Sequence, residues 1–537
     1  MKFKLAVNSE GFPFLYNAAG RATLLPGLDI GNRMPGNFAG NAESHDYNTI
    51  QLLYAENVLP TPDGLISVGV TDYIAAEGTA TTFDRIMLLR DEQESAYLYS
   101  PAGGDNWVYK QAADVWYSSY PLADVEDKRV TQAFVNGNTY TFFEGTKALI
   151  WNSGSEELED FFSKLPEGYT VDQIRYVCAA SNYIVICTDT EILWSSLVDV
   201  TDLDDRIGGA GRQIPVDLRG RITAILPIAG GFIIYTSRNA VAAYHTSNAE
   251  SPFLFREILG AGGVSSPEQV THEANVKYHY TYGTSGLQRV TLDAAETIQP
   301  ALADFLRGKT YNKWNASTKQ IDTVLAAGVL DVRLQYLLNR YLMISYAKEG
   351  DHFQFVLVYD DVLNRWGKIR VEHIDCCLLP LEIGQAYQTY ESLDPQTYED
   401  LGDTDYADFA ASSIAESSLI GSIGFLKNTG QIQVLVTDPS SDAAAGGVAV
   451  YGHIQLVRDR WLTLQEVEID SAVETAAPTV YVLPSNDGKT RQAGTQLTFF
   501  EDSWLGAGIT AKNLDLAVTG NFFITTIIAE ATPHGKR

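Results

Sequence analysis

The chain has 537 residues, of which 38 are Lys or Arg and 67 are Asp or Glu, so its formal net charge is −29. Tight binding to nucleic acid needs cations that neutralise phosphate, and anionic lipid repels a polyanion of this size. The composition therefore excludes a repressor and a basic peripheral membrane protein. With 45% apolar residues, the chain can form a large core or several domains.

Residues 1–80 are rich in Gly, Pro and Asn and contain few strand signals. The first apolar stretch, 5–7, is shorter than the apolar region of a signal peptide. The longest apolar run, 224–235, is broken by Pro227 and a glycine turn, so no membrane anchor is expected. We therefore expect 1–80 to be an extended arm that is ordered by lying on another part of the assembly.

From about residue 81, the sequence repeats a pattern of short strands joined by tight turns. In one unit, β-branched and aromatic runs at 130–135, 139–143 and 147–151 are separated by turns containing Asn, Gly and Thr. In four units the second turn lies at residues 145, 189, 237 and 283, and intervals of 44, 48 and 46 residues suit one propeller blade per repeat. Six further units are read at 85–110, 174–194, 222–244, 276–292, 332–359 and 422–436.

The pattern predicts an all-β protein built on a β-propeller of six or seven blades. A short helix at 301–306 is expected between Pro300 and Gly308. Longer strands from about residue 448 onward predict a separate β subdomain. The predicted division is an N-terminal arm and interface segment at 1–80, propeller repeats at 81–437 with insertions at 293–320 and 378–418, and a C-terminal β subdomain at 438–537.

The sequence contains no strong enzyme motif. The glycine-rich stretches 208–211 and 260–263 lack the spacing and the following helix of a phosphate-binding loop. His272, Glu273 and His279 have ligand chemistry, but eight scattered histidines produce such proximity by chance. We expect no catalytic residue, no cofactor and no metal site. Four cysteines, too few and too irregularly spaced for a disulfide scaffold or a zinc ribbon, are expected to be buried thiols: Cys178, Cys187, Cys376 and Cys377.

The segment 485–490, Ser-Asn-Asp-Gly-Lys-Thr, is similar to the Asp-box hairpin of sialidases and other propellers. In that hairpin the aspartate caps backbone N–H groups of a turn, which is a structural role. A sialidase also needs an arginine cluster and a tyrosine nucleophile, and no spacing here identifies them. The motif and the many aromatic residues leave open an alternative function, a carbohydrate-binding or glycan-hydrolysing β-propeller.

Acidic side chains gather at three places in the sequence. Two clusters follow the strand-final residues Trp151 and Trp194 of successive repeats, and a third lies in the tyrosine-rich insertion. A solvated surface is the simplest interpretation. Arranged about an axis, the clusters would instead line a lumen or an interface. The candidate residues are Glu156, Glu157, Glu159, Asp160, Asp199, Asp202, Asp204, Asp205, Glu399, Asp400, Asp403 and Asp405.

The order of motifs around the third repeat resembles a known family. A strand ending in Trp194 and two serines is followed by the turn 199–203, the glycine-rich loop 208–211 and the strand opening of 217–225. This order resembles the signature of tail nozzle or tail hub proteins of short-tailed bacteriophages, also called packaged-DNA stabilisation proteins. Val200 stands where that family often has Pro. Three further stretches agree, at 56–64, 359–368 and 458–468, so the resemblance covers roughly residues 45–490.

The resemblance implies a structural virion protein of a short tail, without catalysis, that assembles into a homohexameric tube. Such a tube lies below the portal and adaptor proteins, retains the packaged genome, conducts it during ejection and carries tail fibres or spikes. The implied location is the tail of the virion, after assembly in the host cytoplasm. The acidity then has a role, because carboxylates lining a conduit repel phosphate and let DNA pass without tight binding.

Overall fold

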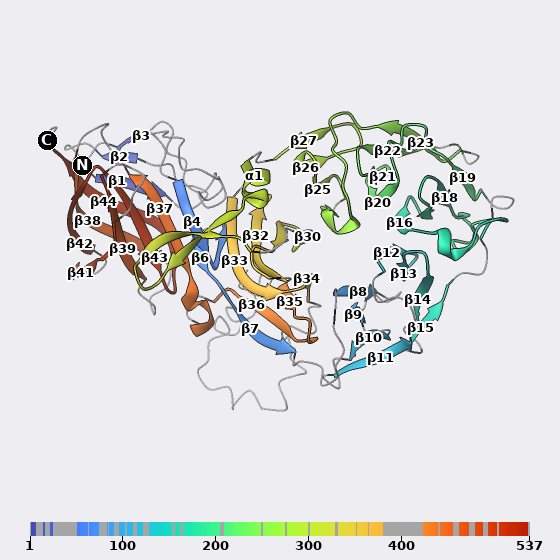
Figure 1. Ribbon diagram of the computed structural model, residues 1–537, viewed down its shortest axis with the longest axis horizontal. Helices are drawn as coiled ribbons and strands as arrows, with labels where there is room; N and C mark the ends of the chain where they lie inside the picture. Colours follow the sequence, from blue (N-terminus) through green and yellow to red (C-terminus); the bar gives the residue numbers. More distant parts are fainter. Residues whose placement is uncertain are drawn as a thin grey trace, which may run out of the picture.

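The structure is a computed structural model that describes residues 2–6, 14–16, 22–24, 51–379 and 423–534, with short gaps inside the last two ranges. The predicted all-β class is confirmed. The described chain forms two β bodies side by side, a ring of four-stranded units and a β-sandwich that holds both termini (Figure 1). The predicted insertion 378–418 lies outside the described residues from 380 onward.

The ring is a β-propeller, and the described residues supply seven antiparallel four-stranded blades. Blades 1 to 3 comprise β8 (Met87–Arg90), β9 (Ala96–Ala102), β10 (Asp105–Lys110) and β11 (Val115–Pro121); β12 (Val130–Val135), β13 (Asn138–Phe143), β14 (Lys147–Asn152) and β15 (Glu157–Asp160); and β16 (Tyr176–Ala180), β17 (Tyr183–Cys187), β18 (Ile192–Trp194) and β19 (Gly211–Gln213). Blades 4 and 5 comprise β20 (Ile222–Ile228), β21 (Gly231–Thr236), β22 (Ala240–His245) and β23 (Phe253–Glu257); and β24 (Val270–His272), β25 (His279–Gly283), β26 (Gly286–Val290) and β27 (Ala295–Thr297). Blades 6 and 7 comprise β30 (Val332–Leu337), β31 (Tyr341–Tyr346), β32 (Phe353–Asp360) and β33 (Arg365–His373); and β34 (Asp375–Leu378), β35 (Ile423–Leu426), β36 (Ile432–Val436) and β7 (Gly69–Ile74).

Burial explains why these segments form strands in this order. The second strand of a blade has neighbours on both edges and blades on both faces, so its residues form a continuous apolar run. Every residue of β17, β21 and β31 is buried. Seven hydrophobic clusters fill the seven interfaces between neighbouring blades in the described chain, and one of them joins Phe83 and Trp107 of blade 1 to Leu426 and Ile432 of blade 7. The ring is therefore closed by packing.

The N-terminal part of the chain closes the ring a second time. β7 is the outer strand of blade 7 and pairs antiparallel with β36, from Ile74 opposite Ile432 to Gly69 opposite Val436. Because β7 and β36 lie far apart in the sequence, the backbone hydrogen bonds of this pair tie the two ends of the propeller together.

Gly69 offers a test of this closure. A Cβ atom on Gly69 would lie 1.8 Å from the carbonyl oxygen of Ala443, in the 3₁₀ helix Asp442–Gly446, so no side-chain rotation can relieve the clash. We expect Gly69→Ala to lower the free energy of unfolding by about 1–3 kcal/mol, the usual cost of overpacking. Gly506→Ala is the matched control, because a Cβ atom on Gly506 meets nothing within 4 Å. Urea unfolding followed by fluorescence compares the two variants; equal midpoints would show that β7 is not held against this helix.

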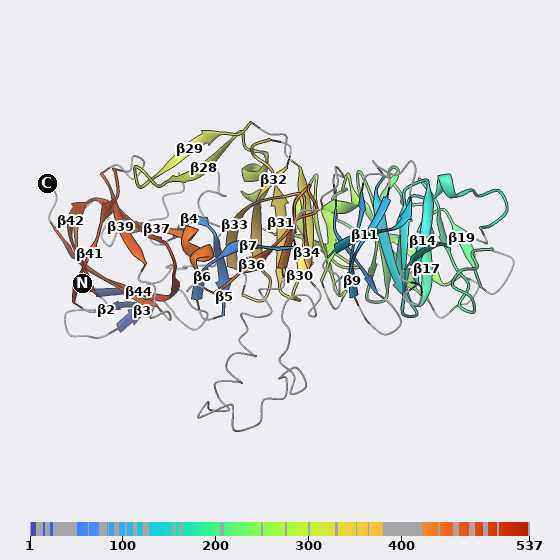
Figure 2. The same ribbon diagram turned by 90° about the horizontal axis from the view of Figure 1, so that it is seen from below.

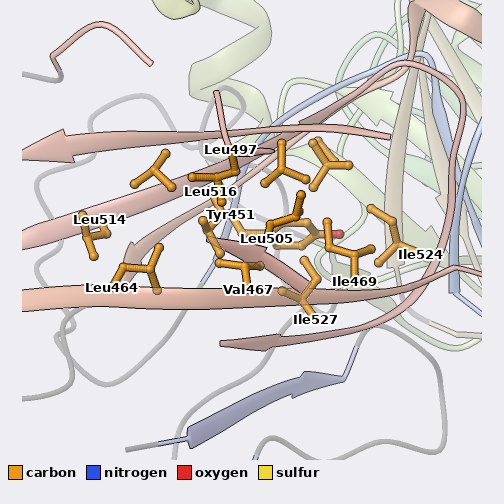
Figure 3. Close-up of a cluster of buried hydrophobic side chains, with 14 of the residues drawn as sticks. Tyr451, Leu464, Val467, Ile469, Leu497, Leu505, Leu514, Leu516, Ile524 and Ile527 are labelled. Atoms are coloured by element: carbon orange, nitrogen blue, oxygen red, sulfur yellow. The ribbon is translucent and has the colours of Figure 1, made fainter. Parts of the chain in front are cut away.

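The second body is a sandwich of two sheets. One sheet contains β4 (Gln51–Glu56), β37 (Val448–Ile454), β43 (Asn513–Thr519), β39 (Thr479–Ser485) and β40 (Thr495–Gln496). The other contains β1 (Lys2–Ala6), β2 (Phe14–Tyr16), β3 (Ala22–Leu24), β44 (Phe523–Pro533), β38 (Leu462–Ser471), β42 (Trp504–Ala511) and β41 (Thr498–Glu501). Figure 3 shows the core between them, where Leu514 and Leu516 of β43 face Leu464 and Val467 of β38.

Two connections join the sandwich to the propeller. The sheet of β44 continues through β6 (Gly64–Ser67) and β5 (Val58–Thr61) into β33 of blade 6, where Val58 pairs with Lys368. The second connection follows the helix α1 (Ala301–Arg307), as the hairpin β28 (Thr310–Asn315) and β29 (Gln320–Leu325) extends from the propeller towards the sandwich (Figure 2). There the backbone N–H of Trp314 donates to the Tyr54 hydroxyl at 3.0 Å.

The observed elements differ from the predicted division in two places. Residues 51–74, predicted as part of an extended arm, form the strands β4 to β7, each of which pairs with a strand from the second half of the chain. The first insertion, predicted at 293–320, follows β27, the last strand of blade 5, and ends with β29 at Leu325. The local sequence contains Gly and Pro and offers one short hairpin, β5 with β6. The other pairing partners of these strands lie hundreds of residues away.

Candidate functional site

The central channel of the propeller forms a cavity. Its volume is about 690 Å³, and residues of the first strand of every blade, or residues directly before that strand, line it. The wall is mostly apolar, with Val130, Val177, Ile225 and Val270 contributed by four blades. The charged side chains of the lining gather at the end of the channel where the first strands begin.

Asp375 is the central acceptor at this charged end and binds groups from three blades. Its Oδ2 accepts the backbone N–H of Ile86 at 3.0 Å and lies 3.1 Å from Nη1 of Arg333. Its Oδ1 accepts Nε2 of Gln335 at 2.7 Å and the N–H of Cys376 at 2.9 Å. The carboxylate is buried and fully hydrogen-bonded, as a buried charge must be.

Glu268 is the second carboxylate of the channel, and it lies on the 3₁₀ helix Pro267–Gln269. Its Oε1 lies 3.6 Å from Nη1 of Arg85, an ion pair between blades 5 and 1. Burial lowers the pKa of Arg333, but the charges of Asp375 and Glu268 raise it overall. Burial likewise lowers the pKa of Arg129, but two other effects raise it overall. These are the hydrogen bond that its guanidinium donates to the Tyr176 hydroxyl and the charge of Glu268. Glu268 therefore acts on three guanidinium groups.

An arginine stands at the same place in four successive blades. Arg129, Arg175 and Arg221 directly precede β12, β16 and β20, and Arg85 stands two residues before β8. Arg175 and Arg221 both bind Oδ1 of Asp189, at 2.9 and 2.8 Å. Burial would raise the pKa of Asp189, but these two arginines lower it overall. The pattern was visible in the sequence and would have indicated a cationic rim around the channel.

The described members of the predicted acidic clusters do not line this channel. Glu157, Glu159 and Asp160 lie exposed on β15, the outermost strand of blade 2. In the loop after β18, Oδ1 of Asp199 accepts the N–H of Thr201 at 2.9 Å, and Oδ1 of Asp202 accepts the N–H of Asp204 at 3.0 Å. This second cluster caps local turns. The remaining candidates lie outside the described residues: Glu156, Asp205, Glu399, Asp400, Asp403 and Asp405.

The residues considered for metal binding do not converge. His279 is buried, with Nδ1 2.9 Å from the Tyr235 hydroxyl and Nε2 2.8 Å from the Pro227 carbonyl. His272 instead binds the backbone carbonyl of Glu273 through Nδ1 at 3.0 Å. Among the described residues, no group of three or more His, Cys, Asp or Glu side chains could hold a metal ion. All four cysteines are free and buried, and burial raises the pKa of each thiol.

A second polar cluster lies between blades 5 and 6, around Asp361. Its carboxylate accepts the hydroxyls of Tyr278 and Tyr280 and lies 2.6 Å from Nη2 of Arg289. Tyr280 stacks on Tyr336 of blade 6, with ring centroids 5.9 Å apart. Burial, followed by the hydrogen bond to Asp361, raises the pKa of Tyr278 to about 12. These contacts satisfy one another and hold two blades together.

The structure describes only the first two residues of the Asp-box-like segment 485–490. Ser485, the first residue of the Asp-box-like segment, is buried at the end of β39, and residues 487–490 lie outside the described chain. In the described part of the chain, no helix has the length and apolar character that crossing a membrane requires.

No model of a known protein family matches the chain, and no curated protein matches it. Solved structures that are similar to it in fold include the following two. One is U3-55K, at a TM-score of 0.38 and 9% sequence identity, covering 68% of this chain and 98% of that one. The other is the extracellular domain of a one-component system, BT4673, from B. thetaiotaomicron, at a TM-score of 0.40 and 9% identity, covering 97% of this chain and 68% of that one.

Proposed function

We propose that the protein is a structural subunit of a short phage tail, a nozzle or hub that forms a homohexameric ring. In this proposal the ring retains packaged DNA, conducts it during ejection and links the adaptor to the tail fibres or spikes. The observation that carries the proposal is that two of the resembling motifs lie side by side in the structure. The stretches 56–64 and 359–368, two of those that resemble the nozzle family, lie together at the junction of propeller and sandwich, where β5 pairs with β33.

The contacts at this junction favour a rigid subunit. Lys368 is 2% exposed, and its Nζ lies 3.8 Å from Oε2 of Glu56. The same ammonium group lies 4.5 Å from the ring centroid of Phe355 and 5.2 Å from that of Tyr54. Burial lowers the pKa of Lys368 to about 8. A desolvated charge held by these three groups orients the two bodies closely, which suits a subunit that bears the load of a packaged genome.

The propeller channel is too small for DNA, which favours a DNA path between subunits. The cavity of about 690 Å³ contains the side chains of Arg85, Glu268, Arg333 and Asp375. The Arg85–Glu268 pair links blades 1 and 5 across it, and the Arg333–Asp375 pair links the neighbouring blades 6 and 7. A duplex, whose major groove alone is about 12 Å wide, does not pass through such a space. In the proposed ring, DNA therefore passes through the lumen that several copies enclose, and each propeller is a wall element without catalytic activity.

Electron micrographs and native mass spectrometry of the purified protein test the proposal. We expect rings of six-fold symmetry and a mass six times that of one chain, stable at micromolar concentration. A strictly monomeric protein that binds or cleaves a glycan would overturn the proposal and favour the carbohydrate alternative. Arg238→Met is a suitable control variant, because Arg238 is exposed at a turn of blade 4 and should leave the ring unchanged.

A further inference from the structure

The central channel has the dimensions and the wall of a ligand site. Its volume of about 690 Å³ falls within the range of about 300–1,000 Å³ found for small-molecule pockets. Such pockets are mostly apolar and contain a few convergent polar groups. One large apolar side chain of the channel wall, Phe134, is 45% exposed, although phenylalanine is among the residues most often fully buried. Its ring therefore adds apolar surface to the channel wall.

The charged groups of the channel are concentrated at one end. Arg85 and Arg129 lie at this end, where the first strands of their blades begin. Phe134 is five residues further along the strand than Arg129, a distance of about 16 Å at the usual rise of a strand. Asp375 is saturated by its four donors. Glu268 is the remaining carboxylate, and it faces the charges of Arg85, Arg129 and Arg333.

The contact between Glu268 and Arg85 is loose. Its N–O distance of 3.6 Å exceeds the 2.7–2.9 Å or so of a charge-assisted hydrogen bond, and 22% of the Glu268 side chain is exposed. A ligand carboxylate that approaches Arg85 to hydrogen-bonding distance would therefore compete with Glu268 for this arginine. The carboxylate that neutralises the cationic end is thus exchangeable, in contrast to the fixed carboxylate of Asp375.

We propose that the propeller channel binds a small amphipathic carboxylate, whose anionic head replaces Glu268 at Arg85 and whose apolar body lies along the channel towards Phe134. Glu268 is then an internal competitor that occupies the head-group position when the ligand is absent. The proposed site is independent of the role of the chain in a tail.

Octanoate, 1-octanol and acetate are probes that separate the two parts of the site. Isothermal titration should show octanoate binding at least tenfold more tightly than 1-octanol, which has the same chain without the charge, and more tightly than acetate, which lacks the chain. Glu268→Gln should increase octanoate affinity about tenfold by removing the competitor. Arg85→Met should reduce octanoate affinity at least tenfold, as expected for a lost charged hydrogen bond.

Two further variants make the result specific. Phe134→Ala should weaken octanoate and 1-octanol by a similar factor, because it changes only the apolar part. Arg238→Met changes an exposed arginine at a turn of blade 4 that is not part of the channel lining, so this variant should bind octanoate like the wild type. Equal affinities for octanoate and 1-octanol, unchanged affinity in Glu268→Gln, or no binding by either the wild type or Glu268→Gln would each overturn the proposal. Ring formation, measured on the same samples, reports separately on the proposed function.

Discussion

Replacing Asp375 by alanine should lower the free energy of unfolding of the propeller by about 3–5 kcal/mol, the usual cost of leaving one partner of a buried ion pair unpaired. The side chains of Asp375 and Arg333 are only 5% and 17% exposed, so water cannot replace the lost carboxylate. The Ile86 N–H and the Gln335 amide also lose their acceptor. Because these donors come from blades 1 and 6, the substitution loosens both neighbours of blade 7.

Urea unfolding followed by tryptophan fluorescence measures this effect. Asp375→Asn keeps one oxygen acceptor and should lose less stability than Asp375→Ala. The double variant Asp375→Ala/Arg333→Met should be more stable than the sum of the single changes predicts, because it removes the orphaned cation as well. Glu157→Gln is the control, since Glu157 is exposed on the outer strand of blade 2. A loss below about 1 kcal/mol in Asp375→Ala would show that the carboxylate does not hold the ring closed.

The repeats of the propeller were predictable because their signal is local. The turns at residues 145, 189 and 237 fall between the second and third strands of a blade, and Gly283 is the last residue of the second strand of blade 5. All seven predicted units correspond to the seven blades, and the helix expected at 301–306 is observed as α1, Ala301–Arg307. Each of these features depends on hairpins or on a short periodic segment, which neighbouring residues determine.

The closing strand was not predictable in this way. β7 has the sequence Gly-Val-Thr-Asp-Tyr-Ile, with three consecutive exposed residues in its middle, so its apolar pattern is weak. Its structure comes from β36, which lies more than 350 residues later. β5 and β6 pair with each other as a local hairpin, but their pairings with β33 and β44 at the junction also join segments that lie far apart in the sequence. Hydrogen bonding between distant segments therefore supplies what the local sequence does not show.

The sequence did not indicate the charged end of the propeller channel, for a related reason. Acid clusters after Trp151 and Trp194 are conspicuous in the sequence, but they occupy the outer strand and the loops of their blades. A buried charge depends on partners that lie elsewhere in the sequence. Nζ of Lys348, for example, donates to the carbonyls of Phe305, Leu306 and Gly308 at 2.8–2.9 Å, at the C-terminal end of α1. A lysine in an apolar stretch of sequence gives no sign of that helix end.

Acid should destabilise the propeller well before its carboxylates are fully protonated, because two buried histidines are held neutral. Burial, opposed by a hydrogen bond to the Pro227 carbonyl and assisted by the charge of His272, lowers the pKa of His279 to about 3. Burial, opposed by a hydrogen bond to the Val371 carbonyl and assisted by Arg333, lowers the pKa of His373 to about 4. Both values lie below the 6.5 or so of an unfolded histidine.

The sign of the effect follows from proton binding. Below pH 6.5 the unfolded chain binds protons at both histidines while the folded chain does not, so stability falls as the pH drops from about 6.5 towards 4. At 1.36 kcal/mol or so per pH unit and proton, each histidine costs about 2–3 kcal/mol of stability at pH 4.5. The loss should be reversible on returning to pH 7, where both rings are neutral in either state.

Two substitutions can distinguish the effect of the buried histidines from the titration of carboxylates. Each replaces a histidine by an amide side chain that can still donate the hydrogen bond. In His279→Gln the amide nitrogen takes the place of Nε2 towards Pro227, and in His373→Asn it takes the place of Nδ1, which lies 2.9 Å from the Val371 carbonyl. The double variant should be less stable than the wild type at pH 7.5, but its stability should depend less on pH between 6.5 and 4.5, because neither amide binds a proton. His245→Gln, at an exposed ring, should retain the wild-type slope. Urea midpoints at half-unit pH intervals measure these slopes. An unchanged slope in the double variant would place the acid sensitivity on the carboxylates, whereas a flatter slope assigns it to the contacts that His279 makes between blades 4 and 5 and that His373 makes with Ser345 inside blade 6.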